Sequence, residues 1–137
     1  MKDLDIVVYG ATGFTGRLCV DYLHGLKKDL SWAIAGRNGD KLHAINTKSG
    51  ANVEVLIAEA DDVAALEAIT ARAKVVLSTA GPFHRYGSNL VAACVKNATH
   101  YVYITCENFW VKGLIEKHHA EAAAKLPWQP DLLQRNG

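Results

Sequence analysis

Residues 6–16 read Ile-Val-Val-Tyr-Gly-Ala-Thr-Gly-Phe-Thr-Gly, and this segment is the strongest structural signal in the 137-residue chain. An apolar run ends in three glycines spaced three residues apart, Gly10, Gly13 and Gly16, and a helical pattern follows at once. A strand that turns into a helix in this way presents backbone N–H groups and the positive end of a helix dipole to a phosphate. Gly10 would allow the tight turn, Gly13 the approach of a pyrophosphate, and Gly16 close packing of helix on strand. The stretch predicts a dinucleotide site, with a plain structural turn as the alternative.

Short apolar runs and helical patterns alternate along the rest of the chain. The runs typical of strands are Ile6–Tyr9, Ser31–Ala35, Val53–Ala58, Val75–Thr79 and Tyr101–Thr105. Helical spacing is found over Thr15–Gly25, from Asp40 as N-cap to Asn46, after Asp61-Asp62, over Ser88–Lys96, and from Asn108 or Phe109 to Ala124, with a loop over Ala80–Gly87. This alternation is typical of βαβ units, which form parallel sheets with right-handed crossovers.

The pattern predicts an α/β fold, a Rossmann-type doubly wound parallel sheet of about five strands in the order 3-2-1-4-5. A ligand should lie across the carboxyl ends of the strands, at the switch between strands 1 and 4. Residues 1–124 are predicted to form this nucleotide-binding domain, and residues 125–137 a weakly specified tail. We expect a sixth strand and a substrate domain to be absent.

Charge and cysteine content exclude several classes of partner. Lys and Arg total 15 against 14 Asp and Glu, and the net charge of +1 provides no strong field for nucleic acid or an anionic membrane. No apolar run approaches the roughly 18 residues of a membrane span, and the first residues leave no room for a signal peptide. Cys19, Cys94 and Cys106 form no C-x-x-C pair, which argues against a disulfide framework and a zinc ribbon. We expect a protein of the cytoplasm or another reducing intracellular compartment, not a secreted one.

The end of the second strand indicates which dinucleotide is bound. About 20 residues after the glycine loop, a carboxylate would accept hydrogen bonds from an adenosine ribose and repel a 2′-phosphate. The chain has Gly36-Arg37-Asn38 at this place. An arginine can pair with a 2′-phosphate through its fork and stack on the adenine. We therefore predict NADP(H), with NAD(H) as the alternative if Arg37 is a solvated loop residue and Asp40 faces the ribose.

Two further segments follow strands 3 and 4. Asp61 and Asp62 are predicted to cap a helix, although they could also lie near the adenine. The residues Ser78, Thr79, Ala80, Gly81, Pro82 and Phe83 follow strand 4, across the switch point from the glycine loop. The small residues would let a cofactor ribose or pyrophosphate lie against the backbone, with Pro82 and Phe83 as a wall beside the nicotinamide. The other interpretation is a rigid turn at the end of the sheet.

These motifs together resemble the saccharopine dehydrogenase-like oxidoreductases. The segments that carry the resemblance are Gly-Ala-Thr-Gly-Phe-Thr-Gly (10–16), Ala-Gly-Arg (35–37), Ala-Gly-Pro-Phe (80–83) with Tyr86-Gly87, Leu90-Val-Ala-Ala-Cys94, Thr99-His100-Tyr101, Glu107 and the helix with Trp110 and His118-His119. The similarity covers about residues 4–124 and implies the N-terminal nicotinamide-cofactor domain of that family. It implies pyrophosphate binding by Gly10, Thr12, Gly13, Phe14, Thr15 and Gly16, 2′-phosphate binding by Arg37, and a nicotinamide side formed by Ala80, Gly81 and Pro82.

The sequence departs from the family pattern in two places. In the segment His100–Glu107, Tyr103 replaces an acid and Cys106 replaces a glycine, where substrate would approach. After Ala124 the pattern stops, and the resemblance implies a truncated form without the substrate-binding, dimer-forming region. Both departures affect substrate chemistry more than cofactor binding.

No catalytic residue is assigned from the sequence. None of the five tyrosines has a lysine four residues later, which excludes the Tyr-x-x-x-Lys chemistry of short-chain dehydrogenases. The adjacent His118 and His119 face different directions on a helix, so no metal site is predicted, and His100 near Glu107 is interpreted as a structural hydrogen bond rather than an acid–base pair. The first hypothesis is an oxidoreductase cofactor domain that binds NADP(H) without efficient turnover by this chain alone. The alternatives are a non-catalytic NADP(H)-binding regulatory or interaction module, which could form a homo-oligomer or pair through the edge of strand 5, and a folded remnant that binds nothing.

Overall fold

The computed structural model describes residues 2–26, 28–104 and 107–125. The elements follow one another as β1 (Leu4–Tyr9), α1 (Phe14–Leu26), β2 (Trp32–Gly36), α2 (Gly39–Ser49), β3 (Glu54–Ile57), α3 (Val63–Arg72), β4 (Ala73–Ser78), α4 (Phe83–Tyr86), α5 (Ser88–Lys96), β5 (His100–Tyr103) and α6 (Asn108–Lys125). Of the predicted tail 125–137, Lys125 belongs to α6 and the rest lies outside the described residues, as does Cys106, where the sequence departs from the family pattern.

The five strands form one parallel sheet in the order β3-β2-β1-β4-β5, which confirms the predicted topology. The central strand β1 pairs on both sides, so that Val7 lies between Ala33 of β2 and Val76 of β4. Both Val7 and Val8 are fully buried, because each face of the sheet is covered by helices. This is why the first strand is apolar without a period of two.

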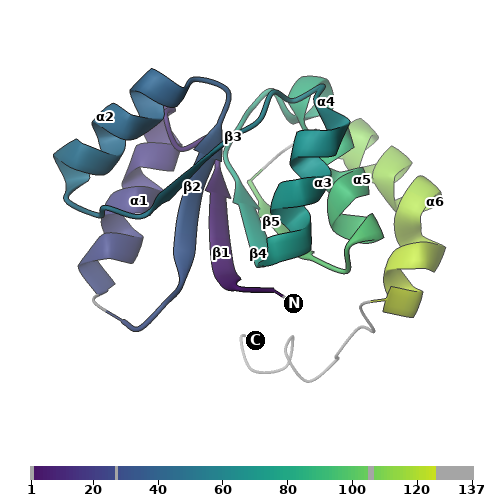
Figure 1. Cartoon of the computed structure of the whole chain (residues 1–137). Helices are drawn as coiled ribbons and strands as arrows, with labels where there is room; N and C mark the ends of the chain where they lie inside the picture. The colour runs from purple at the N-terminus through teal and green to yellow at the C-terminus, as the bar shows by residue number, and fades with distance from the viewer. Residues whose placement is uncertain (1, 27, 105–106, 126–137) are drawn as a thin grey trace, which may run out of the picture.

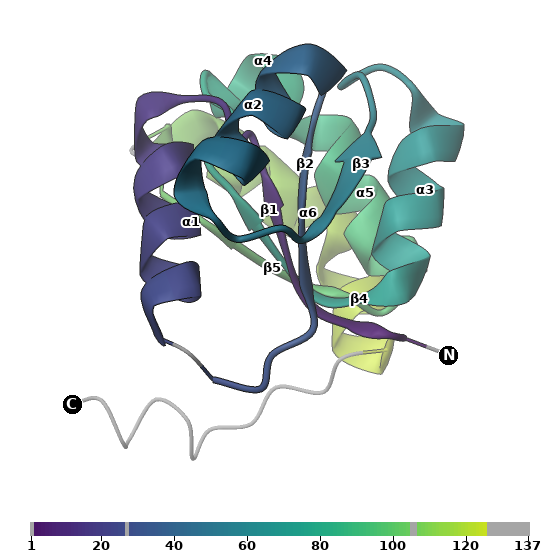
Figure 2. The ribbon, with the colours of Figure 1, turned by 60° about the vertical axis from the view of Figure 1, so that its left-hand side comes forward.

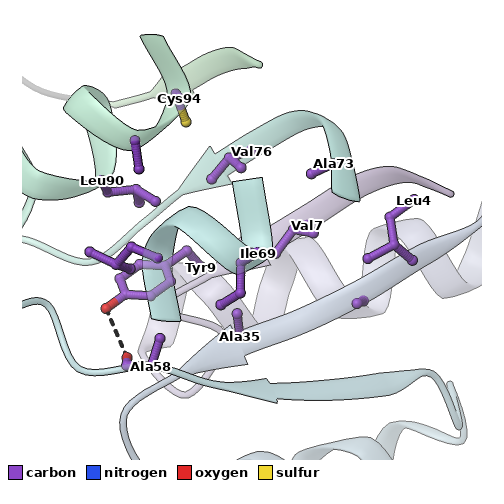
Figure 3. Close-up of a cluster of buried hydrophobic side chains, with 13 residues drawn as sticks. Leu4, Val7, Tyr9, Ala35, Ala58, Ile69, Ala73, Val76, Leu90 and Cys94 are labelled. Atoms are coloured by element: carbon purple, nitrogen blue, oxygen red, sulfur yellow. Dashed lines mark hydrogen bonds between the residues drawn. The ribbon is translucent and has the colours of Figure 1, made fainter. Parts of the chain in front are cut away.

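The helices divide between the two faces of the sheet. Figure 1 shows α1 and α2 on one side and α3, α5 and α6 on the other, and Figure 2 gives a second view of the same layers. One apolar cluster joins Val8 and Ile34 of the sheet to Val20 of α1 and Leu42 of α2. The other face buries a larger cluster. The residues of this cluster that Figure 3 labels are Leu4, Val7, Tyr9, Ala35, Ala58, Ile69, Ala73, Val76, Leu90 and Cys94. The carboxyl ends of the strands are thereby held rigidly between two layers.

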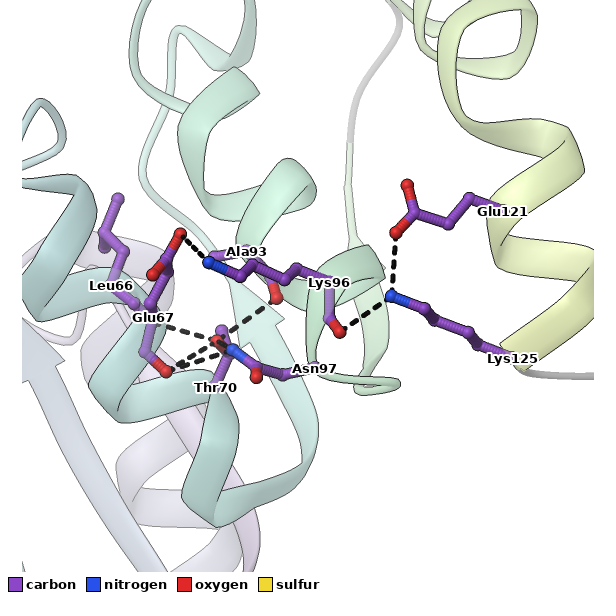
Figure 4. Close-up of polar contacts among 8 residues, drawn as sticks. All are labelled: Leu66, Glu67, Thr70, Ala93, Lys96, Asn97, Glu121 and Lys125. Atoms are coloured by element: carbon purple, nitrogen blue, oxygen red, sulfur yellow. Dashed lines mark hydrogen bonds and ion pairs between the residues drawn. The ribbon is translucent and has the colours of Figure 1, made fainter.

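A polar layer joins α3, α5 and α6 on the second face (Figure 4). The buried Thr70 Oγ1 accepts a hydrogen bond from Asn97 Nδ2 at 2.9 Å and lies 3.3 Å from the Ala93 carbonyl oxygen. Lys96 Nζ pairs with Glu67 at 3.0 Å, and Lys125 Nζ donates to the Lys96 carbonyl at 2.9 Å. The contacts of Thr70 satisfy a buried polar group, as such groups require, while the exposed contacts of Lys96 and Lys125 link α5 to α3 and to α6.

Three local expectations change in the structure. The N-cap of α2 is Asn38, whose side chain accepts the Lys41 N–H at 3.1 Å, while Asp40 lies within the first turn. The prediction of Asp40 as N-cap was wrong because asparagine and aspartate are equally good N-cap residues, and the sequence around Asn38 and Asp40 does not distinguish between them. The α2 helix also continues past Asn46 to Ser49, and the expected loop over Ala80–Gly87 contains the short helix α4.

Candidate functional site

A cavity of about 500 Å³ lies at the carboxyl ends of the strands, at the switch between β1 and β4. Its lining comes from the ends of β1 to β4, the glycine loop and the segment around α4: Tyr9, Gly10, Thr12, Gly13, Gly36, Arg37, Glu59, Ala60, Asp61, Thr79, Ala80, Gly81, Arg85, Tyr86 and Asn89. Open α/β sheets bind ligands in this crevice because the loops diverge at the switch point.

The glycine loop is closely packed at two of its glycines and open at the third. Gly10 has φ of +86°, and a Cβ there would lie 2.8 Å from the Ala80 backbone nitrogen, so the two loops touch across the switch point. A Cβ on Gly16 would lie only 2.2 Å from the Gly10 carbonyl oxygen, because α1 packs directly on the loop. Gly13 differs, since a Cβ there would meet only the Gly10 oxygen at 3.6 Å among the described residues. Its surface is open to a ligand, and the loop therefore fits a pyrophosphate.

The first turn of α1 supplies donors to the same place. The Arg17 N–H bonds the Gly13 carbonyl at 2.9 Å, so the helical bonding begins at Gly13, and the amides just before Arg17 belong to the unpaired first turn of an α-helix. Thr12 and Gly13 line the cavity, whereas Phe14, Thr15 and Gly16 are not part of its lining. The Phe14 side chain is 73% exposed and lines a separate groove between α1 and α2. These three residues can contribute backbone groups to a phosphate, but not side chains to the cavity wall.

Arg37 lies at the end of β2, where the sequence places it, and its side chain is exposed at the cavity. Asp40 is not part of the lining, and the acidic residues of the cavity are instead Glu59 and Asp61, which follow β3. Asp62 caps α3 by accepting the Ala65 N–H at 3.1 Å. The two neighbouring aspartates thus have different positions, one at a helix cap and the other at the cavity.

Tyr9 at the end of β1 also lines the cavity and lies near these charges. Its hydroxyl donates to the Ala58 carbonyl at 3.1 Å, and its ring is 4% exposed (Figure 3). Burial raises the pKa of Tyr9 to about 12; Glu59 and Asp61 act in the same direction and Arg37 in the opposite one. The phenol is therefore neutral at physiological pH, and it serves as a wall and a hydrogen-bond donor rather than as an acid or base.

The segment after β4 contributes backbone to the opposite side of the cavity. Thr79, Ala80 and Gly81 line it, and the Thr79 N–H and hydroxyl bond the Tyr9 and Gly10 carbonyls at 3.0 and 3.1 Å. Ser78 is buried at 1% exposure and Pro82 precedes α4, and neither is part of the lining. The structure thus brings seven of the twelve sequence-predicted residues to the cavity: Gly10, Thr12, Gly13, Arg37, Thr79, Ala80 and Gly81.

The short helix α4 turns in an unexpected direction. Phe83 was predicted to form a wall beside a nicotinamide, but its ring is buried against Tyr103 and Trp110, with 6.0 Å between ring centroids in each pair. Two other residues line the cavity instead: Tyr86, which the sequence analysis named only as part of the family resemblance, and Arg85, which it did not name. Asn89 of α5 joins them and donates its Nδ2 hydrogen to the Ala60 carbonyl at 3.0 Å. No periodic signal marks a four-residue helix, so only the tertiary contacts reveal these residues.

Glu107 lies against α4. Its carboxylate contacts His84 Nδ1 and accepts the Phe83 N–H at 2.8 Å. The hydrogen bond between His100 and Glu107 stays a prediction. Within the described residues, no group of three His, Cys, Asp or Glu side chains could hold a metal ion. In the same part of the chain, no helix combines the length and apolar character that crossing a bilayer requires.

The parallel order, the glycine loop at the first strand and the cavity at the switch point define a dinucleotide-binding domain of the Rossmann type. Residues 6–127 match the family described as the saccharopine dehydrogenase NADP binding domain, and the chain belongs to this family. The family match also confirms NADP as the predicted cofactor.

Curated relatives carry the same domain within longer chains. The chain is 40% identical over 126 residues to a trans-acting enoyl reductase of Mycobacterium leprae, covering 90% of this chain and 30% of the relative. It is likewise 40% identical over 125 residues to the trans-acting enoyl reductase of Mycobacterium tuberculosis strain H37Rv, covering 89% and 30%. The chain therefore spans about 30% of the length of these relatives.

Solved structures agree on the fold. Apo histidine-tagged saccharopine dehydrogenase (L-Glu forming) from Saccharomyces cerevisiae superposes with a TM-score of 0.68 at 20% identity, covering 81% of this chain and 24% of that one. An NADPH-dependent quinone oxidoreductase from Escherichia coli superposes with a TM-score of 0.60 at 24% identity, covering 88% of this chain and 42% of that one. At these identities the likeness concerns the fold alone.

Proposed function

We propose that the cavity is the NADP(H) site of an oxidoreductase, with the glycine loop on the pyrophosphate, Arg37 on the 2′-phosphate and the segment after β4 on the nicotinamide side. The loop residues are Gly10, Thr12, Gly13, Phe14, Thr15 and Gly16, and the nicotinamide-side residues are Ser78, Thr79, Ala80, Gly81 and Pro82. The open surface of Gly13 beside the unpaired first turn of α1 carries this proposal. Phe14, Thr15 and Gly16 contribute through the backbone, while Ser78 and Pro82 support the wall from behind.

Charge supports the assignment of Arg37. Its side chain is exposed at the cavity, and no carboxylate is found at the end of β2 itself. Glu59 and Asp61 face the same cavity from the end of β3 and can bind polar groups of the nucleoside. A guanidinium pairs with a phosphate through two parallel hydrogen bonds, which a 2′-hydroxyl cannot replace.

The bound cofactor would supply hydride chemistry. The residues of this chain bind and orient it: the loops at Gly10 and Ala80 hold it against the sheet, and Tyr9 lines the cavity. Hydride transfer also needs a substrate beside the ring and water kept out of the site. The relatives named trans-acting enoyl reductases support a reductase activity for the whole protein, and we expect residues 1–137 alone to bind NADP(H) without efficient turnover.

A second candidate function is a non-catalytic NADP(H)-binding module that acts through association. β5 is an edge strand of the described sheet; Val102 within it is 49% exposed, and Ile104 just after it is 58% exposed. Exposed edge strands pair readily with another chain. Pairing through β5, including formation of a homo-oligomer, would give such a module its partner. The free thiols of Cys19 and Cys94 support a reducing intracellular compartment such as the cytoplasm.

Calorimetric titration with NADPH and with NADH tests the main proposal. We expect binding of NADPH that is tighter than binding of NADH, and no heat from either at millimolar concentration would refute the proposal. Light scattering with and without NADPH tests association through β5, and a strict monomer at high protein concentration would contradict it.

A further inference from the structure

The helix α4 is held on one side and faces the cavity on the other. Phe83 is 8% exposed and packs against Tyr103 and Trp110, while Arg85 and Tyr86 line the cavity. The helix is only four residues long, so it has little internal stability of its own. Its position must come from the groups that bind it from outside.

The carboxylate of Glu107 is one of those groups. Its Oε2 accepts the Phe83 N–H at 2.8 Å, and its Oε1 accepts the His84 N–H at 3.3 Å and contacts His84 Nδ1. The carboxylate thus covers the first N–H groups of α4, which have no intrahelical partner. Hydrogen bonds to an ionised acceptor are about twice as strong as neutral ones, and this side chain is largely buried.

Further contacts restrict the residues on both sides of this carboxylate. The His84 ring lies 5.7 Å from the Phe109 ring, centroid to centroid, and the Trp110 N–H bonds the Glu107 carbonyl at 3.0 Å. Trp110 Nε1 donates to Ser88 Oγ at 2.9 Å and so joins the start of α6 to the start of α5. Glu107 is therefore fixed to the same framework as the helix that it holds.

We propose that Glu107 is a positioning residue that fixes α4, and through it holds Arg85 and Tyr86 against the nicotinamide half of the bound cofactor. This inference rests on the proposed NADP(H) site. Arg37 at the end of β2 lies on the other side of β1 from β4, and in the proposed site it binds the 2′-phosphate of the adenosine half. The effect of Glu107 should consequently be confined to one half of the cofactor, because α4 follows β4.

Two probes separate the halves of the site. NADPH contacts both halves, whereas adenosine 2′,5′-bisphosphate carries only the adenosine half with its 2′-phosphate. We expect Glu107→Ala to weaken NADPH binding by about tenfold, within the range for groups that share one hydrogen-bond network, and to change bisphosphate binding by less than about twofold. Glu107→Gln keeps an acceptor for the Phe83 N–H and should restore most of the NADPH affinity. Glu121→Ala, which removes a carboxylate paired with Lys125 on α6, is the matched control and should bind both probes as the wild type does.

A double-mutant cycle tests whether Glu107 acts through α4. In an Arg85→Ala, Tyr86→Ala background, Glu107→Ala should cause little further loss of NADPH affinity, because the contacts that it positions are already gone. Thermal unfolding followed by circular dichroism shows whether each variant is folded. If Glu107→Ala is not folded, Glu107→Gln takes its place in the binding measurements. Equal weakening of both probes, no weakening, or full additivity in the cycle would overturn this inference while the NADP(H) site stands. Failure of the wild type to bind either probe would overturn the site itself.

Discussion

Replacing Gly16 by alanine tests the packing of the glycine loop on α1. The added Cβ would lie 2.2 Å from the Gly10 carbonyl oxygen, 2.7 Å from Ala11 Cα and 2.9 Å from the Gly10 carbonyl carbon. All three atoms belong to the backbone, so no flexible side chain can move aside. The Gly10 N–H is also bonded to the Ala35 carbonyl at 2.9 Å, which ties the loop to β2. The helix and the loop must therefore separate by about an ångström, an overpacking of the kind that costs roughly 1–3 kcal/mol.

We expect the upper end of this range, about 3 kcal/mol, which corresponds to a melting temperature lowered by roughly 10 °C for a domain of this size. Gly113→Ala is the matched control, because a Cβ at this position in α6 meets no atom of the described residues within 4 Å. Alanine in a helix interior is more favourable than glycine by about 0.5–1 kcal/mol, so the control should be stabilised.

Urea unfolding followed by circular dichroism measures both variants, and calorimetry with NADPH measures their binding. Gly16→Ala should also bind NADPH more weakly, since the displaced loop no longer presents its amides to the pyrophosphate. A Gly16→Ala protein within about 0.5 kcal/mol of the wild type, or a Gly113→Ala protein destabilised equally, would refute the packing argument.

Four further results are expected. Arg37→Ala should weaken NADPH binding by about 1–3 kcal/mol and leave NADH binding unchanged. The α1 surface variant Arg17→Ala is the control and should change the binding of neither cofactor. Equal affinity of the wild type for NADPH and NADH in calorimetry would contradict the role of Arg37. Burial raises the pKa of Cys94 from 9.0 and of Tyr9 from 10.0, each to about 12. The stability that these two neutral groups contribute is therefore complete below pH 9 and is lost as the pH rises to about 12. Urea unfolding free energies that stay constant between pH 9 and about 12 would be inconsistent with these shifts. Asn38→Ala should lower the unfolding free energy by about 1 kcal/mol through loss of the α2 cap and Asp40→Ala by less, with the reverse order showing that Asp40 is the cap. Trp110→Ala should cost about 3–5 kcal/mol in the same assay, because the ring is 8% exposed and packs on Phe83 and Tyr103, and a loss below about 1 kcal/mol would show that this cluster contributes little.

The sequence was sufficient for most of the architecture because its signals are local. Alternating apolar runs and helical spacing predicted the five strands, and the glycine loop after the first strand indicated the Rossmann-type order that the sheet has. The glycine spacing of residues 10–16 predicted the turn, and the structure shows why each position matters: Gly10 touches Ala80, Gly16 touches Gly10, and Gly13 is open. Seven of the predicted site residues line one cavity since the carboxyl ends of parallel strands share one edge of the sheet.

Tertiary structure decided what depends on groups far apart in the chain. Which of Asn38 and Asp40 caps α2, and which of Asp61 and Asp62 faces the cavity, are differences of one or two positions that local propensity does not distinguish. Phe83 turns away from the cavity because the aromatic rings of β5 and α6 offer it a buried site, and Arg85 and Tyr86 consequently face inward.

The sequence alone was enough to predict a nucleotide-binding α/β domain, because glycines at a strand–helix turn mark such a site, and Arg37 after β2 favoured NADP(H) over NAD(H). The family was predicted from the resemblance of several segments over about residues 4–124, and the family match agrees with both predictions. The tertiary structure alone decided how the nicotinamide side is built. The contact of Glu107 with Phe83 and His84 spans more than 20 residues, and its geometry exists only after β5 has paired with β4. Hydrogen bonds of this kind form between groups that no period or motif connects, so their partners are known only from the folded chain.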